Sequence, residues 1–296
     1  MDHYFIDKNK AEFIHIQPNQ KTENVYFANE KIDKKEIEQL NVQNSTFSNM
    51  GFKETSFQLC EFSFSVFINC YFKKAVCQQV KFQSCIFIAC NFEGASFINC
   101  DFQYAKFDDC YIAFEAMKNN LPHEKENLNG ALCKALSIQC IKAGAIEDYK
   151  KNLFEERHAS EIHAFRKAFH SNIAYYKKYG FFDGIDGLLS FIRSKISKFL
   201  WGYGEKMGVL LRNMLLIIVL YATAYFFHSE QILKVGISKY PVISALFYSA
   251  CTFFSMNVEI GTLSAEWKVI TLSEHILGTV LVSLFAAALF RQINRR

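Results

Sequence analysis

The amino-acid sequence predicts a mixed fold, in which a β-solenoid is followed by a helical neck and then by a membrane-spanning helical segment. Three observations carry this prediction. A large apolar residue recurs at every fifth position over residues 47–112, amphipathic helical patterns follow over residues 132–200, and long apolar runs occupy the last third of the chain. A strict period of five belongs to neither a helix nor a strand, so it indicates short repeats that bury their apolar faces on one another.

Composition and charge narrow the class of protein. The chain has 296 residues, enough for two modest domains, and its formal net charge of +4 is too small to indicate nucleic-acid binding by itself. Residues 1–13 lack the apolar core of a signal peptide, so we expect no cleavable signal and a cytoplasmic location for the first two-thirds of the chain. The ten cysteines are then expected to be reduced and to act as small buried apolar residues.

The five-residue period is carried mainly by phenylalanine. The series has fourteen positions, namely Phe47, Phe52, Phe57, Phe62, Phe67, Phe72, Cys77, Phe82, Phe87, Phe92, Phe97, Phe102, Phe107 and Ile112. The position two residues earlier is mostly small, as at Ser45, Thr55, Cys60, Ser65, Cys70, Ala75, Val80, Cys85, Cys90, Ala95, Cys100, Ala105 and Cys110, with Met50 as the bulky exception. Weaker matches at Phe27, Ile32, Ile37 and Val42 keep the same phase upstream.

This pattern resembles the pentapeptide-repeat family, whose units fold into a right-handed quadrilateral β-helix. In that fold the central residue and the small residue two positions before it point inward, and four repeats make one coil. The resemblance implies that the fourteen repeats form about three and a half coils, a rod about 17 Å long. The resemblance also implies that the cysteines in the small position are packing residues and not metal ligands.

Some members of that family mimic duplex DNA with a strongly acidic surface. Between Val42 and Ile112 we count five lysines and six acidic residues, a net charge of −1. No duplex-DNA mimicry is therefore expected, and a scaffold for docking or spacing is the favoured interpretation of the solenoid.

The neck is expected to contain three helices. After a polar stretch at 118–129, helical patterns run to Ala143 and again from Ala145 to Phe169, separated by Gly144, which predicts an αα-hairpin. A third helix is expected at 183–200, capped by Asp183. Because this helix is basic, amphipathic and directly precedes a membrane span, it is expected to lie in the headgroup plane.

Residues 150–212 carry twelve Lys or Arg and six Asp or Glu, a local charge of +6. Two interpretations stay open: attraction to anionic inner-leaflet lipid, and a site for an anionic ligand with tyrosines available for stacking. The candidate anion-binding residues are Arg157, Arg166, Lys167, Lys177 and Lys178, beside Tyr175, Tyr176 and Tyr179. The histidines of this region match no zinc signature, and no metal site is expected.

Three apolar runs lie in the last third of the chain, at 207–227, 240–258 and 269–290. Lys and Arg flank the first and last runs, so the positive-inside rule places both ends in the cytoplasm and requires an even number of spans. The middle run, opened by Pro241, is therefore expected to be a re-entrant helix between two transmembrane helices, with a third span as the alternative. The expected location is the bacterial inner membrane, with cytoplasmic N- and C-termini.

The order of helix, short helix, loop and helix resembles two-helix tetrameric cation channels. Residues 245–253 (ALFYSACTF) resemble the pore helix of that family, and residues 273–278 (SEHILG) resemble the start of its inner helix. Where the family has TVGYGD, residues 255–261 read SMNVEIG and lack the glycines of a potassium filter, so potassium selectivity is not expected. The GYG at 202–204 precedes the first span, and matches instead a juxtamembrane GYGE of pentapeptide-repeat proteins fused to such a channel unit.

The candidate pore and selectivity residues are Ser255, Asn257, Glu259 and Glu274. Four copies of Glu259 would form an acidic ring that favours cations, whereas its simpler role is a solvated loop carboxylate. A carboxylate in an apolar helix is a functional candidate. Glu274 is equally consistent with a residue that hydrogen-bonds the re-entrant loop.

The sequence thus predicts four segments: an N-terminal segment (1–26), the pentapeptide-repeat β-helix (27–116), the basic helical neck with its juxtamembrane amphipathic helix (117–206), and a two-span channel-like domain (207–296). No catalytic constellation and no cofactor motif occur, so we expect no enzyme activity. The predicted function is that of an ion-channel-like membrane protein gated through its cytoplasmic module. The alternative is a non-conducting, membrane-anchored scaffold that recruits a partner protein.

The full order of segments resembles bacterial pentapeptide-repeat ion-channel proteins, among them membrane effectors of antiphage systems such as Hailong. The resemblance implies a homo-oligomer, a tetramer by analogy, that arrests growth by depolarising the membrane. It also implies control by a nucleotide or single-stranded oligonucleotide made by a partner nucleotidyltransferase.

Overall fold

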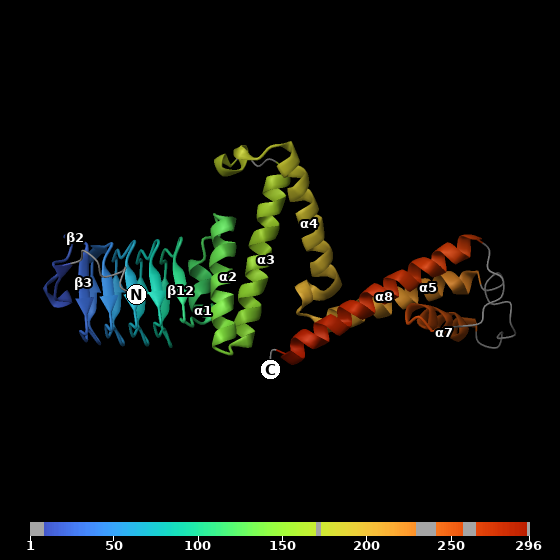
Figure 1. Cartoon of the computed structure of the whole chain (residues 1–296), viewed down its shortest axis with the longest axis horizontal. Helices are drawn as coiled ribbons and strands as arrows, with labels where there is room; N and C mark the ends of the chain where they lie inside the picture. Colours follow the sequence, from blue (N-terminus) through green and yellow to red (C-terminus); the bar gives the residue numbers. More distant parts are fainter. Residues whose placement is uncertain (1–8, 170–172, 229–240, 257–264, 295–296) are drawn as a thin grey trace. The chain divides into compact units, whose positions relative to one another are not determined.

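The computed structural model describes residues 9–169, 173–228, 241–256 and 265–294. The chain divides into two compact units, Met1–Phe191 and Ile192–Arg296, and the division falls within one helix. The first unit begins with a stack of short strands that runs into a helical neck, and the second unit is helical (Figure 1).

The strands of the first unit stack in three parallel sheets. The six-stranded sheet contains, in order, β1 (Asn9–Lys10), β3 (Val25–Ala28), β6 (Thr46–Ser48), β8 (Val66–Ile68), β10 (Ile86–Ile88) and β12 (Lys106–Asp108). The four-stranded sheet contains, in order, β11 (Ser96–Ile98), β9 (Val76–Gln78), β7 (Ser56–Gln58) and β4 (Glu36–Glu38). The two-stranded sheet pairs β2 (Lys21–Glu23) with β5 (Asn41–Gln43).

Paired residues in these sheets lie twenty positions apart, as Phe47 opposite Phe67 and Ser56 opposite Val76, except where β1 pairs with β3. Twenty residues are four repeats of five, so the predicted coil of four repeats is confirmed. The solenoid has about five turns, more than the three and a half expected from the fourteen strongest repeats. The difference arises upstream, where β2 and β3 already pair in the same register although their repeats seldom carry phenylalanine.

The inside of the solenoid is a set of phenylalanine ladders. Along one wall the rings of Phe27, Phe47, Phe67, Phe87 and Phe107 stack with centroid separations of 5.0, 4.6, 5.0 and 5.1 Å. These spacings follow the distance between neighbouring strands, so each turn adds one ring to every ladder. All five rings are buried, and their burial supplies the main stabilising free energy of the stack.

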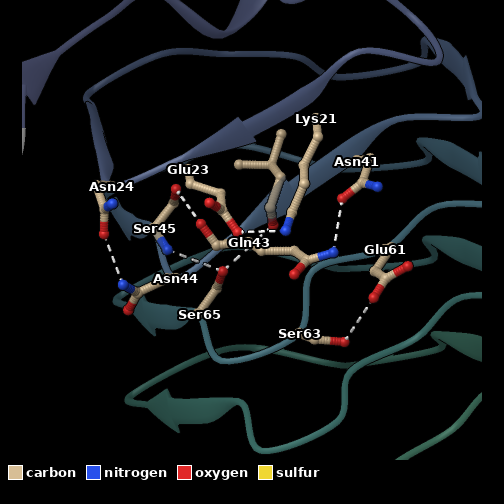
Figure 2. A network of polar contacts seen from close by, with 11 residues as sticks. Lys21, Glu23, Asn24, Asn41, Gln43, Asn44, Ser45, Glu61, Ser63 and Ser65 are labelled. Atoms are coloured by element: carbon tan, nitrogen blue, oxygen red, sulfur yellow. Dashed lines mark hydrogen bonds and ion pairs between the residues drawn. The ribbon is translucent and has the colours of Figure 1, made fainter.

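The small residues hold the turns together by hydrogen bonds. The Ser65 hydroxyl accepts the N–H of Ser45, and the Ser45 hydroxyl accepts the N–H of Val25 while donating to the Gln43 carbonyl (Figure 2). Cys85 occupies the same position as these serines, and its thiol donates to the Phe62 carbonyl at 2.9 Å. A small polar or weakly polar side chain therefore fits this inward position and joins one coil to the next.

Every repeat also contains one residue with positive φ, two positions after the inward residue. Asparagine fills several of these corners and forms ladders, with Asn69 donating to Asn49 and Asn49 to Asn29. Asparagine tolerates the left-handed conformation better than other non-glycine residues. Figure 2 shows one rung, in which the Asn44 amide donates to Asn24 at 2.6 Å.

Both ends of the solenoid are covered. At the first, the short helix η2 (Phe13–His15) places the Phe13 ring against Phe27, Phe47 and Phe52. At the second, α1 (Phe114–Met117), η3 (Lys118–Asn120) and α2 (Glu126–Lys142) close the stack.

The covering helices satisfy the backbone of the last coils. The Asn120 amide donates to the Phe97 carbonyl at 2.9 Å and its oxygen accepts the Cys100 N–H at 2.7 Å, while the Gln139 amide donates to the Phe107 carbonyl at 3.0 Å. Leu132 and Leu136 of α2 join the same hydrophobic core as the phenylalanine ladders. The solenoid and the neck are thus one unit, and its open edge is not exposed.

The neck confirms the predicted hairpin. α2 turns through Gly144, at φ +70°, into α3 (Ile146–Ala168), and the two helices pack along each other (Figure 1). The short helix η4 (Ala174–Lys178) precedes α4 (Phe181–Trp201), which begins two residues earlier than expected. Asp183 therefore lies in the first turn of α4 and caps the N-terminus of the helix from there, because its carboxylate accepts the Gly180 N–H at 3.1 Å.

The second unit contains η5 (Gly202–Gly204), α5 (Met207–Phe227), α7 (Pro241–Phe253) and α8 (Ala265–Asn294). α5 and residues 266–291 of α8 are long and apolar enough to cross a membrane, which makes them two candidate spans. α7 has only 13 residues, about 20 Å of helix against a hydrocarbon core of about 30 Å, so it is too short for a third span. It packs against both α5 and α8.

Candidate functional site

Glu274 is fully buried in α8, where it links α8 to α5 and α7. Its carboxylate accepts a hydrogen bond from the Tyr225 hydroxyl of α5 at 2.6 Å and contacts the Ser249 hydroxyl of α7. The Ser249 hydroxyl also donates to the Ile218 carbonyl of α5 at 2.9 Å. A carboxylate among apolar helices is costly unless it is hydrogen-bonded, and this one is held by partners from two other helices.

A close backbone approach fixes the other end of α7. Gly278 of α8 lies against Phe253, and a Cβ at this glycine would stand 2.8 Å from the Phe253 carbonyl carbon and overlap its oxygen. Only glycine permits this approach. Two further hydrogen bonds join the helices, between the hydroxyls of Tyr221 and Ser273 at 2.8 Å and between those of Tyr248 and Thr271 at 3.5 Å.

The remaining predicted pore residues follow α7. Ser255 is exposed and has φ +60°, so the chain turns sharply just after the helix ends. Asn257 and Glu259 lie outside the described residues. Glu274 is thus brought together with α7, but it is enclosed by its partners within one protomer and does not line an open surface.

The junction before α5 forms a second polar cluster in this unit. The Asn213 amide of α5 donates to the carbonyls of Phe199 and Leu200, at 2.7 and 3.0 Å, and so caps the C-terminal end of α4. The Arg291 guanidinium lies over the Trp201 ring, 5.2 Å from its centroid. The end of α4 therefore contacts the beginning of α5 and the end of α8.

In the neck, Arg166 takes part in a buried network. Arg166 pairs with Glu126, which is 5% exposed, and the Tyr176 hydroxyl donates to the other carboxylate oxygen at 3.0 Å. The Tyr176 oxygen lies 3.0 Å from His163 Nδ1. Burial, with the hydrogen bond to Glu126, raises the pKa of Tyr176, and burial, with the nearby lysines, lowers the pKa of His163.

The other cations predicted to bind an anion lie in three different surroundings. Lys167 pairs with Asp186 at 2.8 Å, which raises its pKa, and lies 3.8 Å from Asp183. Lys178 stands over the Tyr175 ring, 3.9 Å from its centroid. Arg157 and Lys177 are exposed.

The structure therefore places Arg166, Lys167 and Lys178 near the tyrosines in and just after η4. Arg166 shares Glu126 with Tyr176, whereas the ammonium groups of Lys167 and Lys178 lie 5.3 Å and 3.9 Å from the ring centroids of Tyr179 and Tyr175. Two of the three cations already hold carboxylates. An anion that binds there must compete with those carboxylates for Arg166 and Lys167.

Sequence reasoning missed several residues of these clusters. Glu126 lies 40 residues before its partner Arg166, within a polar stretch that reads as a linker. Tyr225 reads as an ordinary member of an apolar run and Ser249 as one small residue of a pore helix, whereas Asn213 is expected from the sequence to snorkel or to face a partner helix. A signal did exist for Asn213 and Glu274, because a polar side chain inside an apolar span needs a partner.

Among the described residues, no group of three or more His, Cys, Asp or Glu side chains is placed to hold a metal ion. The ten cysteines are all free and buried. Seven of them lie in the phenylalanine core of the solenoid, where packing and hydrogen bonds to carbonyls account for them.

Comparison with known proteins bears on the solenoid. Residues 75–111 match the family model for pentapeptide repeats, in eight copies. Two solved structures of QnrB1, a plasmid-mediated fluoroquinolone resistance protein, are similar at 19% and 20% sequence identity, with TM-scores of 0.19 and 0.16. The similar regions cover 34% and 32% of this chain and 59% and 57% of the QnrB1 chains, a little over half of their length.

No curated protein matched the chain. The family match agrees with the twenty-residue register and the buried phenylalanine ladders described above. This chain carries a pentapeptide-repeat β-solenoid of about five turns, followed by helices of which two are candidate membrane spans.

Proposed function

We propose that the protein is a non-enzymatic, ion-channel-like membrane protein of the bacterial inner membrane, with both termini in the cytoplasm. It acts as a homo-oligomer, a tetramer, and its solenoid and neck control a pore built from α5, α7 and α8. The observation that carries this proposal is α7, a 13-residue apolar helix held between two span-length helices.

The contacts of α7 support a membrane setting. A short helix at membrane depth is tolerated only where neighbouring helices cover it and its polar groups are satisfied. Glu274, Tyr225 and Ser249 satisfy one another around α7, and Gly278 admits the end of α7 against α8. Leu215, Leu220 and other apolar side chains of the spans face outward, as they would toward lipid or another protomer.

The proposed pore does not select potassium. Residues 255–261 have no run of glycines with which to line an axis with carbonyls. We place Ser255, Asn257 and Glu259 at the pore, where four copies of Glu259 favour cations over anions. Glu274 acts beside the pore by holding α7 in place.

The proposed trigger is a nucleotide or single-stranded oligonucleotide made by a partner nucleotidyltransferase, and the proposed biological role is an antiphage, abortive-infection effector. The neck supplies the phosphate contacts through Arg157, Arg166, Lys167, Lys177 and Lys178, and the η4 tyrosines supply stacking surfaces. Phosphate competes with Glu126 for Arg166 and with Asp186 for Lys167, so ligand binding rearranges the neck.

Electrical recording of the purified, fully assembled protein in planar bilayers tests this function. We expect single-channel currents that respond to nucleotides or short oligonucleotides, with little preference for potassium over sodium. The variant Glu259→Gln should lower the preference for cations over anions. Silence under every ligand tried, from a fully formed tetramer, would contradict conduction and favour a membrane-anchored scaffold that recruits a partner.

A further inference from the structure

Helix α4 presents two unlike faces. Gly184 and Gly187 are its buried residues, and a Cβ on Gly187 would lie 2.9 Å from the Ala164 carbonyl oxygen and 3.0 Å from the Ala168 nitrogen. α4 therefore crosses α3 in backbone contact at Gly187, and Phe191 packs beside the crossing with its ring centroid 5.3 Å from that of Phe165 in α3. Most of the other apolar side chains of α4 lie on a different side of the helix.

Those apolar side chains are exposed on a single side of the helix. At about 100° per residue they fall within an arc of about 120°. The exposed members are Phe181, Phe182, Ile185, Leu188, Leu189, Ile192, Ile196 and Phe199. Their exposed fractions run from 40% for Leu188 to 84% for Phe182, so the described chain leaves an apolar strip along the length of α4. A continuous strip of this kind calls for an apolar covering.

The charges on α4 suit a membrane surface better than a protein groove. Arg193 and Lys195, both exposed, project about 80° to either side of the middle of the apolar arc. Cations at the two margins of an apolar face can reach lipid phosphates while the face enters the acyl boundary. The acidic residues near the start of the helix, Asp183 and Asp186, are drawn toward Lys167.

Chain connectivity keeps α4 close to the candidate spans. Only residues 202–206 separate it from α5, and Leu200 and Trp201 at its end pack with the core formed by α5, α7 and α8. Five residues reach at most about 18 Å. If α5 crosses a membrane, the C-terminal end of α4 must therefore lie at the surface of that membrane.

We propose that the apolar face of α4, from Phe181 to Phe199, is a membrane-binding face that lies among the headgroups of anionic lipid. The acyl chains of the lipid cover the apolar strip, and its phosphates contact Arg193 and Lys195. This inference rests on the membrane placement of α5 and α8 in the proposed function, and does not depend on conduction.

The test attaches an environment-sensitive fluorophore to the full-length protein in lipid nanodiscs. Leu189→Cys places the label on the apolar face. Ser190→Cys, one residue later and about 100° around the helix, places it off that face and serves as the matched control. The native cysteines are all buried, so they should not compete for the label. Nanodiscs with brominated acyl chains quench a fluorophore that enters the lipid.

We expect the label at residue 189 to be strongly quenched and blue-shifted in phosphatidylglycerol nanodiscs, and the label at residue 190 to be quenched far less. The label at residue 189 should also be quenched more in phosphatidylglycerol than in phosphatidylcholine nanodiscs. Combining Leu189→Cys with Arg193→Gln and Lys195→Gln should remove this difference between the two lipids. Equal quenching at both positions would overturn the proposal. So would efficient disulfide formation between Leu189→Cys protomers in detergent, which would show that a second copy covers the face. Electrical silence in the bilayer experiment would leave this result unaffected.

Discussion

At the scale of single residues, the corner positions of the solenoid are where the sequence and the backbone conflict most. Leu59, Phe64 and Tyr104 all have positive φ, at 53°, 63° and 61°. Each is more than half exposed, so its side chain gains little burial there. A non-glycine residue in the left-handed region costs about 1–2 kcal/mol, less for asparagine, which suggests that these corners are not optimised for stability.

Replacing Phe64 by asparagine should therefore stabilise the solenoid. The residue one coil earlier is Asn44, which already hydrogen-bonds Asn24, so the new amide can extend that ladder. We expect Phe64→Asn to raise the free energy of unfolding by about 1 kcal/mol, read from the urea midpoint of the β-sheet circular dichroism signal. Phe62→Ala, at a buried inward position two residues away, should lower it by about 3–5 kcal/mol. A destabilised Phe64→Asn variant would contradict this account of the corners.

The cysteines predict a pH dependence of solenoid stability. Burial raises the pKa of Cys60 to about 11 and that of Cys85 to about 12, whereas an unfolded chain has a thiol pKa of about 8.5. Above pH 8.5 the unfolded chain releases protons that the folded chain retains, which favours unfolding. The contribution of the buried thiols to the free energy of unfolding is complete below pH 8.5 and is lost as the pH rises toward 11–12.

We expect the urea midpoint of the solenoid to fall between pH 8.5 and pH 11. In Cys85→Ala this fall should be smaller, because one buried thiol is gone and alanine already occupies the same position at Ala75 and Ala95. An identical pH slope in the variant would show that the thiols do not contribute.

At the scale of elements, the short helix α7 depends on the absence of a side chain at Gly278. The chain provides a matched control, because a Cβ built on Gly208 in α5 meets nothing within 4 Å, whereas a Cβ on Gly278 overlaps Phe253. Gly278 lies inside α8, where alanine gains about 1 kcal/mol of helix propensity, and Gly208 is the second residue of α5, where the gain is smaller.

Gly278→Ala should lower the melting temperature of the detergent-solubilised protein, because α7 must move away from α8. Gly208→Ala should leave it unchanged or slightly raised. Differential scanning fluorimetry of both variants beside the unaltered protein checks this. Equal effects of the two substitutions would mean that the close approach of Phe253 to Gly278 contributes nothing to stability.

Sequence periodicity was sufficient for some elements and not for others. The fivefold series fixed the register of the coils, because a buried phenylalanine must meet its counterpart twenty residues away. It undercounted the turns, since the early repeats carry Ile32, Ile37 and Val42, which alone resemble many other patterns. The capping roles of η3 and α2 depend on Asn120 and Gln139, and amides give no periodic signal.

The candidate sites could be predicted only in part, for a related reason. Composition located the basic neck and the carboxylate in α8. Many of their ion pairs and hydrogen bonds join residues far apart in the sequence, such as Lys167 with Asp186, 19 positions apart, and Tyr176 with Glu126, 50 positions apart. Such pairs follow from tertiary packing, so the sequence alone did not show that Arg166 and Lys167 already hold carboxylates.

At the scale of the whole molecule, the chain consists of two compact units, and the boundary between them falls within α4. The solenoid, its capping helix and the hairpin share one continuous set of contacts, so they should move as one body. The candidate spans form the second unit, with α7 between them. In the proposed function the first unit is the cytoplasmic module and the second contains the pore, whose structure depends on α7.

Ion flux from liposomes tests that claim most directly. Vesicles loaded with potassium chloride are reconstituted with the unaltered protein, Gly208→Ala or Gly278→Ala in equal amounts of assembled oligomer, and release is followed with and without short oligonucleotides. The account predicts matching ligand-dependent flux for the unaltered protein and Gly208→Ala, and at least a tenfold change for Gly278→Ala, about 1.4 kcal/mol in the equilibrium that seats α7. Equal flux from all three, or none from any, would contradict a pore that depends on α7.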